Sequence, residues 1–327
     1  MADNLQIARV RAVLPKAIRD WIFDKNVTMI GVGWPERDGA YDPSEVALCF
    51  HVRQKYESGS QLETAVMRGN TGGTIPEAID GVRTDVLQSV PRLHQFWGGW
   101  RLGSSSANPR GRVVQPIQGG VSIGCERLYG SGTLGGLVVD RQTKRLMCLS
   151  NWHVLVARWT NNPPLRIYQP GRLDGGAVSN TFAILERDAM IDNLDAAVAR
   201  LYGDRPLINN QLDIGPVRGL ARPGLGMEVV KSGYKTNVTK GIITRTYLTA
   251  KMRYDGQDRL IRSVFYINPL PGSDTVSDAG DSGSLWLETR THYAVGLHFA
   301  GGNYPEHALA MDINDVLNAL QVDLVAG

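Results

Sequence analysis

The stretch SDAGDSGSLW, residues 277–286, decides how the rest of the chain is interpreted. Gly, Ser and Asp dominate its first eight residues, and the chain then turns apolar. These residue types are typical of turns, so a plain surface turn is one interpretation. The other is that the loop holds Ser282 as a nucleophile beside backbone N–H groups. The remaining sequence has to distinguish the two.

The bulk composition narrows the class of protein. The 327 residues suffice for two domains, and 43% of them are hydrophobic, enough for a sizeable core. The formal net charge is only +3 and the basic residues form no run, which argues against nucleic acid as a partner. The sequence has no apolar stretch of membrane-spanning length, and its N-terminus is charged and lacks an apolar signal core. We therefore expect no membrane contact and a location in the cytoplasm.

The number and spacing of the cysteines fit a cytoplasmic location. Cys49, Cys125 and Cys148 are few, odd in number and without CxxC spacing, which predicts buried, reduced thiols. Their spacing does not match a metal-binding motif. We expect neither a metal nor a cofactor.

Two regions differ in periodicity. Residues 1–105 predict a small α+β domain with a helix over residues 7–22, strands near 27–34 and 45–55, a short helix over 60–67 and a third strand after residue 80. Pro15 should kink the first helix or start a new one. Residues 94–109 are rich in Gly and Ser and predict a linker. Residues 106–327 alternate short apolar runs with turns and end in a helix near residues 312–324, which predicts a mainly β domain. Deleting residues 1–105 should leave a core that folds.

Two further motifs accompany the loop. CLSNWHVLV, residues 148–156, places His153 directly after an apolar strand. DNLDAAVARL, residues 192–201, places Asp195 at the start of another. Taken alone, His153 could be a core histidine and Asp195 a strand-entry residue. Their occurrence in the order His, Asp, Ser is what favours a joint role.

In that order the motifs resemble those of the trypsin/chymotrypsin-like serine proteases, bacterial trypsin-like branch, over about residues 110–327. GTLGGLVV, residues 132–139, and VVKSGYKTNVTKGII, residues 229–243, resemble further segments of that family. The resemblance implies a mainly β, chymotrypsin-like double β-barrel with a C-terminal helix. His153 and Asp195 would come from the first barrel and Ser282 from the second.

The resemblance also implies a mechanism. Ser282 would attack a carbonyl carbon, His153 would take and return the proton, and Asp195 would orient the imidazole. We expect His153 to hydrogen-bond both partners, with Asp192 as the alternative carboxylate. The backbone N–H groups of Gly280 and Ser282 would form the oxyanion hole. Asp281 should bond locally and need no activating cleavage.

The segment GLHFAGG, residues 296–302, resembles the pocket strand of glutamyl endopeptidases. By resemblance the substrate-binding residues are His298, Phe299, Ala300 and Val276. His298 would read an acidic side chain, although it could equally fill the pocket wall. Val276 stands where trypsin has an acidic residue, which argues against basic specificity. Asp274 and Asp278 flank it and keep a basic preference open.

Two functions from different classes follow. The first is an intracellular serine endopeptidase that processes a specific protein or peptide substrate. The second is a catalytically silent peptide-binding or scaffold module on the same fold. A complete triad with its glycines favours the first, because a pure binder has no need of all three side chains. Residues 1–105 could bind a regulatory partner or a second copy of the chain.

Overall fold

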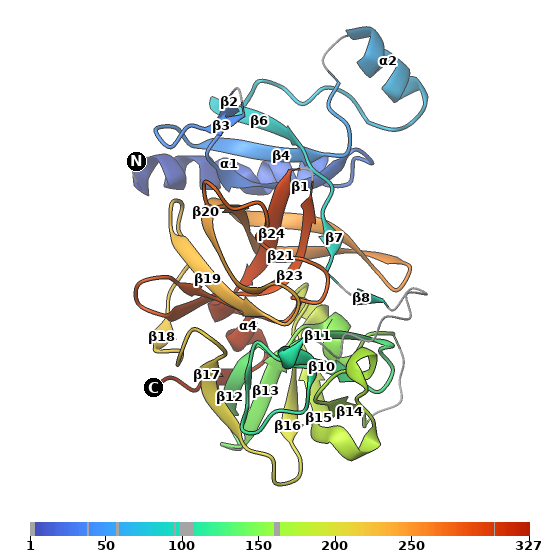
Figure 1. Ribbon diagram of the computed structural model, residues 1–327. Helices are drawn as coiled ribbons and strands as arrows, with labels where there is room; N and C mark the ends of the chain where they lie inside the picture. The colour runs from blue at the N-terminus through green and yellow to red at the C-terminus, as the bar shows by residue number, and fades with distance from the viewer. Residues whose placement is uncertain are drawn as a thin grey trace.

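A computed structural model describes residues 4–37, 39–56, 59–94, 96–97, 108–159, 164–303 and 305–327; for residues 96–97 only the backbone is described. Strands dominate the chain, as the sequence predicts, and they form two large sheets. Figure 1 shows three tiers: the N-terminal elements at the top, a barrel in the middle and the second large sheet at the bottom.

The top tier contains the N-terminal helices and strands. Helix α1 (Asn4–Trp21) packs against β1 (Val27–Gly33), β4 (Ala47–Val52) and β6 (Val82–Gln88). The remaining elements up to the Gly/Ser-rich stretch are β2 (Glu36–Arg37), β3 (Ala40–Tyr41), α2 (Gly59–Met67), β5 (Ala78–Ile79), β7 (Arg92–Leu93) and β8 (Phe96–Trp97). Helix α1 runs through Pro15, so no new helix starts at that residue. Most of the predicted linker lies outside the described residues.

The middle tier is a closed barrel of six strands in the order β19-β22-β23-β24-β21-β20, with β19 paired back to β20. Its strands are β19 (Glu228–Gly233), β20 (Asn237–Tyr254), β21 (Gln257–Pro269), β22 (Leu285–Glu288), β23 (Tyr293–Asn303) and β24 (Glu306–Asp312). Short strand β18 (Gly219–Leu220) pairs with β23. The second half of β20 also pairs with β1, with Met29 opposite Ala250, so the top tier continues the barrel sheet. Among the described residues this combined sheet has twelve strands.

The bottom tier is a sheet whose order is β25-β12-β13-β16-β15-β14-β10-β11-β8. Its strands are β10 (Ser122–Cys125), β11 (Gly130–Thr133), β12 (Gly136–Asp140), β13 (Leu146–Ser150), β14 (Arg166–Tyr168), β15 (Thr181–Asp188), β16 (Ala197–Leu201) and β25 (Val322–Leu324), together with β8. Strands β9 (Ile117–Gly119) and β17 (Leu207–Gln211) pair beside it. The predicted closing helix is α4 (Ile313–Ala319).

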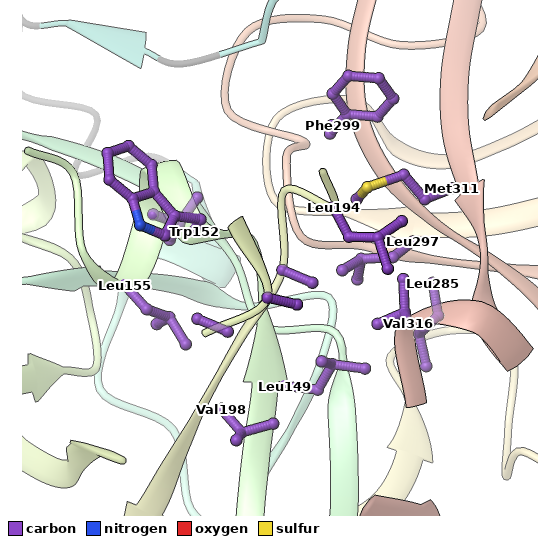
Figure 2. Close-up of a cluster of buried hydrophobic side chains, with 14 of the residues drawn as sticks. Leu149, Trp152, Leu155, Leu194, Val198, Leu285, Leu297, Phe299, Met311 and Val316 are labelled. Atoms are coloured by element: carbon purple, nitrogen blue, oxygen red, sulfur yellow. The ribbon is translucent and has the colours of Figure 1, made fainter. Parts of the chain in front are cut away.

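One hydrophobic core joins the two lower tiers. Figure 2 shows Leu149 and Val198 of the bottom sheet in the same cluster as Leu285, Leu297 and Val316 of the barrel and α4. All five side chains are fully buried. The three cysteines are buried and free, as predicted. No helix of the described chain is long and apolar enough to cross a membrane.

Candidate active site

His153 lies where β13 ends and the one-turn helix α3 (Trp152–Leu155) begins. Strand β13 pairs with β16 so that Ser150 is opposite Ala197, and this register brings the end of one strand beside the start of the other. As a result, His153 Nδ1 lies 2.5 Å from Asp195 Oδ2, and the backbone N–H of His153 donates to Oδ1 at 3.1 Å. The predicted pairing of His153 with Asp195 is therefore present, and Asp192 is not needed in its place.

Asp195 is fully buried and held from several sides. Asn151 Nδ2 donates to its backbone carbonyl at 2.7 Å. The hydroxyl of Tyr254, at the end of β20, donates to Oδ2 at 2.9 Å. Burial, and then the charge of Asp195, raise the pKa of Tyr254 well above its ordinary value. The phenol therefore stays protonated at neutral pH and serves as a permanent donor to the carboxylate.

Ser282 lies in the loop that precedes β22, and its neighbours fix the loop against β23. The N–H of Gly283 donates to His298 O, and the N–H of His298 donates to Ser284 O, each at 2.9 Å. The hydroxyl of Ser282 donates to Phe299 O at 3.1 Å. Among the described hydrogen bonds, that hydroxyl bonds Phe299 and not His153, which differs from the expected arrangement.

The loop nevertheless places Ser282 beside the helix of His153. Gly132 of β11 lies between them: a Cβ added there would come within 2.5 Å of Val154 Cγ2 and 3.1 Å of Ser282 O. Only glycine therefore lets α3 and the serine loop approach this closely. The separation between His153 and Ser282 is set by these packed backbones, whereas the direction of the Ser282 hydroxyl is set by one side-chain torsion.

Asp281 bonds locally, as predicted, but its main partner was not predicted. Lys231 Nζ lies 2.8 Å from Asp281 Oδ2, and both side chains are fully buried. The N–H groups of Lys235 and Thr236 donate to Oδ1 at 2.9 and 3.0 Å. Burial alone would raise the pKa of Asp281, but the charge of Lys231 outweighs it and holds the pKa below its ordinary value. This ion pair fixes the backbone immediately before Ser282.

Gly280 supplies a backbone N–H to the cleft. Its φ of +115° is a conformation that glycine adopts readily and L side chains rarely adopt. The N–H donates to the carbonyl oxygen of His94 at 2.7 Å. A carbonyl oxygen thus already occupies the position that the oxyanion-hole assignment gives to a substrate. The matching role for the N–H of Ser282 stays a prediction.

The predicted pocket residues differ in how they are used. His298 is buried, with Nδ1 3.4 Å from Trp286 Nε1 and Nε2 3.1 Å from His94 Nδ1. Phe299 presents its backbone oxygen to the cleft while its ring is buried in the core, and Ala300 is paired with Leu93.

The role of Val276 in substrate binding stays a prediction. Its side chain is buried in the interior of the middle barrel, in a cluster with Ile243 and Phe265. Glu306 and Thr239 bind its backbone, at 2.8 and 2.7 Å. Val276 is not among the residues that line a cavity of about 530 Å³ beside His94, whereas Asp278 and Ala279 are. Counting back from Ser282 could not reveal which way this side chain turns.

Sequence reasoning also missed Tyr254, Lys231 and His94. The first two lie on strands whose pattern shows only burial, and nothing in the sequence links them to a carboxylate far along the chain. His94 stands at the start of the Gly/Ser-rich stretch and was assigned to the linker. It is 6% exposed and lies in the cleft.

Three solved structures are similar to part of this chain. A protease of Nocardiopsis covers 64% of this chain and 98% of its own, at 19% identity and a TM-score of 0.48. Protease A of Thermobifida fusca covers 64% and 99%, at 17% identity and a TM-score of 0.47. A glutamic acid specific serine protease, described as using a histidine triad in substrate binding, covers 64% and 100%, at 16% identity and a TM-score of 0.48. No protein-family model and no curated protein matches the chain. In structure, the chain is similar to bacterial serine proteases of the trypsin and chymotrypsin type over 64% of its length.

Proposed function

We propose that the chain is a serine endopeptidase that hydrolyses peptide bonds with Ser282, His153 and Asp195. The observation that carries the proposal is the buried His153–Asp195 contact at 2.5 Å, in which the carboxylate also binds the backbone of His153 and the hydroxyl of Tyr254. Such an arrangement fixes which ring nitrogen faces the carboxylate, so Nε2 is the nitrogen that would transfer the proton.

The reaction follows from these positions. Ser282 Oγ turns from Phe299 O toward His153, whose Nε2 takes the hydroxyl proton as Oγ attacks the carbonyl carbon. The negative oxygen that forms is stabilised by the N–H of Gly280, which is already directed at a carbonyl oxygen. His153 then returns the proton to the leaving amine, and water releases the acyl group by the same steps in reverse order. Asp195 stabilises the charged imidazole throughout.

One observation favours the second function, a silent peptide-binding module. The Ser282 hydroxyl is bonded to Phe299 O, and a segment of the same chain fills the cleft. A binder needs the cleft but no nucleophile. The two functions therefore differ in whether Ser282 reacts.

The experiment is labelling of the full chain with a fluorophosphonate, followed by mapping of the modified residue by mass spectrometry. An endopeptidase carries the label on Ser282, and Ser282→Ala removes it. Ser277→Ala is the matched control, because it makes the same change in the same loop and should keep the label. The proposal is contradicted if Ser282 stays unlabelled both in folded wild type and in the folded variant, described below, whose cleft is vacated.

We also propose that the enzyme acts on a specific protein partner in a bacterial cytoplasm. The regular N-terminal tier supports a regulatory or recognition role for residues 1–105, since a digestive enzyme does not need it. The folded Ser282→Ala variant, used as bait in a lysate of the source cells, should retain a protein that active wild type cuts. If the variant retains only proteins that active wild type does not cut, a processing role is contradicted.

A further inference from the structure

Residues 92–94 lie along β23 as an added strand. Leu93 is opposite Ala300 and Arg92 is opposite Gly301, in the antiparallel sense. An extended peptide that joins the edge of a sheet is a common mode of peptide recognition, since the main chain supplies the affinity. The segment arrives from the top tier, and Figure 1 shows β7 running down beside the barrel.

The backbone of His94 is bound at both ends. Its N–H donates to Phe299 O at 3.3 Å, and its carbonyl oxygen accepts from the N–H of Gly280 at 2.7 Å. Ser282 Oγ also donates to Phe299 O, at 3.1 Å. The nucleophile and the backbone nitrogen of His94 therefore share one acceptor atom. The carbonyl of His94 is thus held by the N–H of Gly280, while its own N–H shares an acceptor with the hydroxyl of Ser282.

The side chain of His94 fills the adjoining pocket. Its Nδ1 lies 3.1 Å from His298 Nε2. Gly301 forms the facing wall, where an added Cβ would lie 2.5 Å from His94 Cε1. The imidazole is thus enclosed by a polar contact on one side and by a wall that only glycine can form on the other.

The direction of the His94–His298 bond follows from Trp286. An indole N–H can only donate, so His298 Nδ1 accepts from Trp286 Nε1. Neutral His298 then carries its proton on Nε2 and donates it to His94 Nδ1. Burial, before any neighbouring charge, lowers the pKa of His298 well below its usual value and that of His94 to about 4, which keeps both rings neutral near pH 7. The pocket therefore offers a hydrogen-bond donor to a side chain that accepts.

We propose that residues 92–94 are bound as a substrate of the same chain, that the peptide bond after His94 is the first bond this protease cuts, and that its pocket selects side chains with a hydrogen-bond acceptor. This inference rests on the proposed function. The ring nitrogen of an imidazole, or the oxygen of an amide or carboxylate, can accept a hydrogen bond from the N–H of His298. Lys and Arg side chains can only donate. A substrate side chain without an acceptor would leave the buried N–H of His298 unpaired, and the cost of that lets the pocket discriminate between side chains.

The step balances as an ordinary hydrolysis. Ser282 Oγ bonds to the carbonyl carbon of His94, and its proton passes to His153 Nε2. The C–N bond after His94 breaks, and that proton completes the new amine of residue 95. Water then adds its hydroxyl to the acyl carbon, returns the hydrogen to Ser282 and leaves a carboxylate on His94. The products are residues 1–94 and 95–327.

The test is intact mass spectrometry of the freshly purified, full-length wild-type chain over time. The expected result is fragments 1–94 and 95–327, formed at a rate that does not change on tenfold dilution, because the segment is bound within one chain. Ser282→Ala should stay whole, and Ser277→Ala should be cut like wild type. Cutting elsewhere first, or a rate proportional to concentration, overturns the proposal.

Substitutions at position 94 test the pocket. His94→Asn keeps an acceptor near the place of Nδ1 and should still be cut, whereas His94→Leu should be cut more slowly by at least about tenfold, the effect of about 1.4 kcal/mol for an unpaired buried donor. Far-UV circular dichroism checks that both variants are folded. Equal rates for Asn and Leu overturn the acceptor rule.

A last variant separates this inference from the proposed function. His94→Pro removes the N–H that donates to Phe299 O and the imidazole that fills the pocket, which vacates the cleft. If wild type stays whole and this variant takes the fluorophosphonate on Ser282, the chain is a protease held closed by its own segment, and self-cleavage is wrong. If the folded variant also fails to react at Ser282, the proposed function is wrong as well.

Discussion

At the scale of single residues, Lys231 and Asp281 decide whether the serine loop has a fixed shape. Among the described residues, five donors converge on the Asp281 carboxylate, and the only charged one is the Nζ of Lys231. The remaining four are two N–H groups after β19, the hydroxyl of Thr236 and the N–H of Asp278. Since Ser282 is the next residue along the chain, any movement of Asp281 displaces Ser282 as well.

We predict that Lys231→Met lowers the free energy of unfolding at neutral pH by about 3–5 kcal/mol, because it leaves a buried charge unpaired. The loss depends on pH in a definite direction. The folded pKa of Asp281 lies below its ordinary value, so its contribution in wild type is present above about pH 4 and is lost as the pH falls through the folded pKa. The deficit of the variant should therefore narrow below about pH 4. Urea denaturation at several pH values measures it.

The control is Lys231→Met combined with Asp281→Asn, which removes both charges. It should be more stable than the single variant at neutral pH, since no unpaired carboxylate remains. If the deficit of the single variant does not narrow below about pH 4, packing, and not charge, is what Lys231 provides.

The residue scale also shows what could be predicted from sequence. Short motifs identified His153, Asp195 and Ser282 because each stands directly beside a strand with a clear apolar pattern. Tyr254 was not predictable, since its contact with Asp195 depends on how far β20 extends past the barrel. His94 was not predictable either, because a bound segment and a loose linker have the same composition.

At the scale of elements, β20 connects the three tiers. Its first half pairs with β19 and closes the barrel, and its second half pairs with β1. Its last residue, Tyr254, donates to Asp195. The pattern of the sequence predicted β1 and β4 as strands, but not that they would continue the sheet of the barrel, because pairing between distant strands leaves no local signal.

Gly33 tests this junction. A Cβ at Gly33 would lie 2.3 Å from Arg245 Cγ and 2.6 Å from Thr244 O, so an added methyl must push β1 away from β20. We predict that Gly33→Ala lowers the free energy of unfolding by about 1–3 kcal/mol, as overpacking usually does. Urea denaturation, read as a lower midpoint, measures the loss.

Gly59→Ala is the matched control. A Cβ at Gly59, the first residue of α2, would meet nothing within 4 Å. It should leave the midpoint unchanged or raise it slightly, because alanine favours helix. If Gly33→Ala were as stable as Gly59→Ala, the close approach of β1 to β20 would contribute little to the fold.

At the scale of the whole molecule, the cores of the tiers are continuous. Met29 of β1 is buried in the same cluster as Leu149 and Leu297, and Leu260 of β21 packs against the cluster beneath α1. Arg245, fully buried on β20, lies with its guanidinium carbon 5.0 Å from the ring of Tyr41. A chain of this length often unfolds in stages, but these shared contacts oppose it.

We predict that the folded, uncut Ser282→Ala chain unfolds in a single transition on heating. Tryptophan fluorescence and far-UV circular dichroism should give the same midpoint, because loss of β1 exposes the outer edge of β20 and weakens the barrel beside it. Residues 106–327 alone should still fold, as the sequence indicates, but with a lower midpoint than the whole chain. Two separated transitions in the whole chain, or an equal midpoint for residues 106–327 alone, would show that the N-terminal tier does not stabilise the rest of the chain.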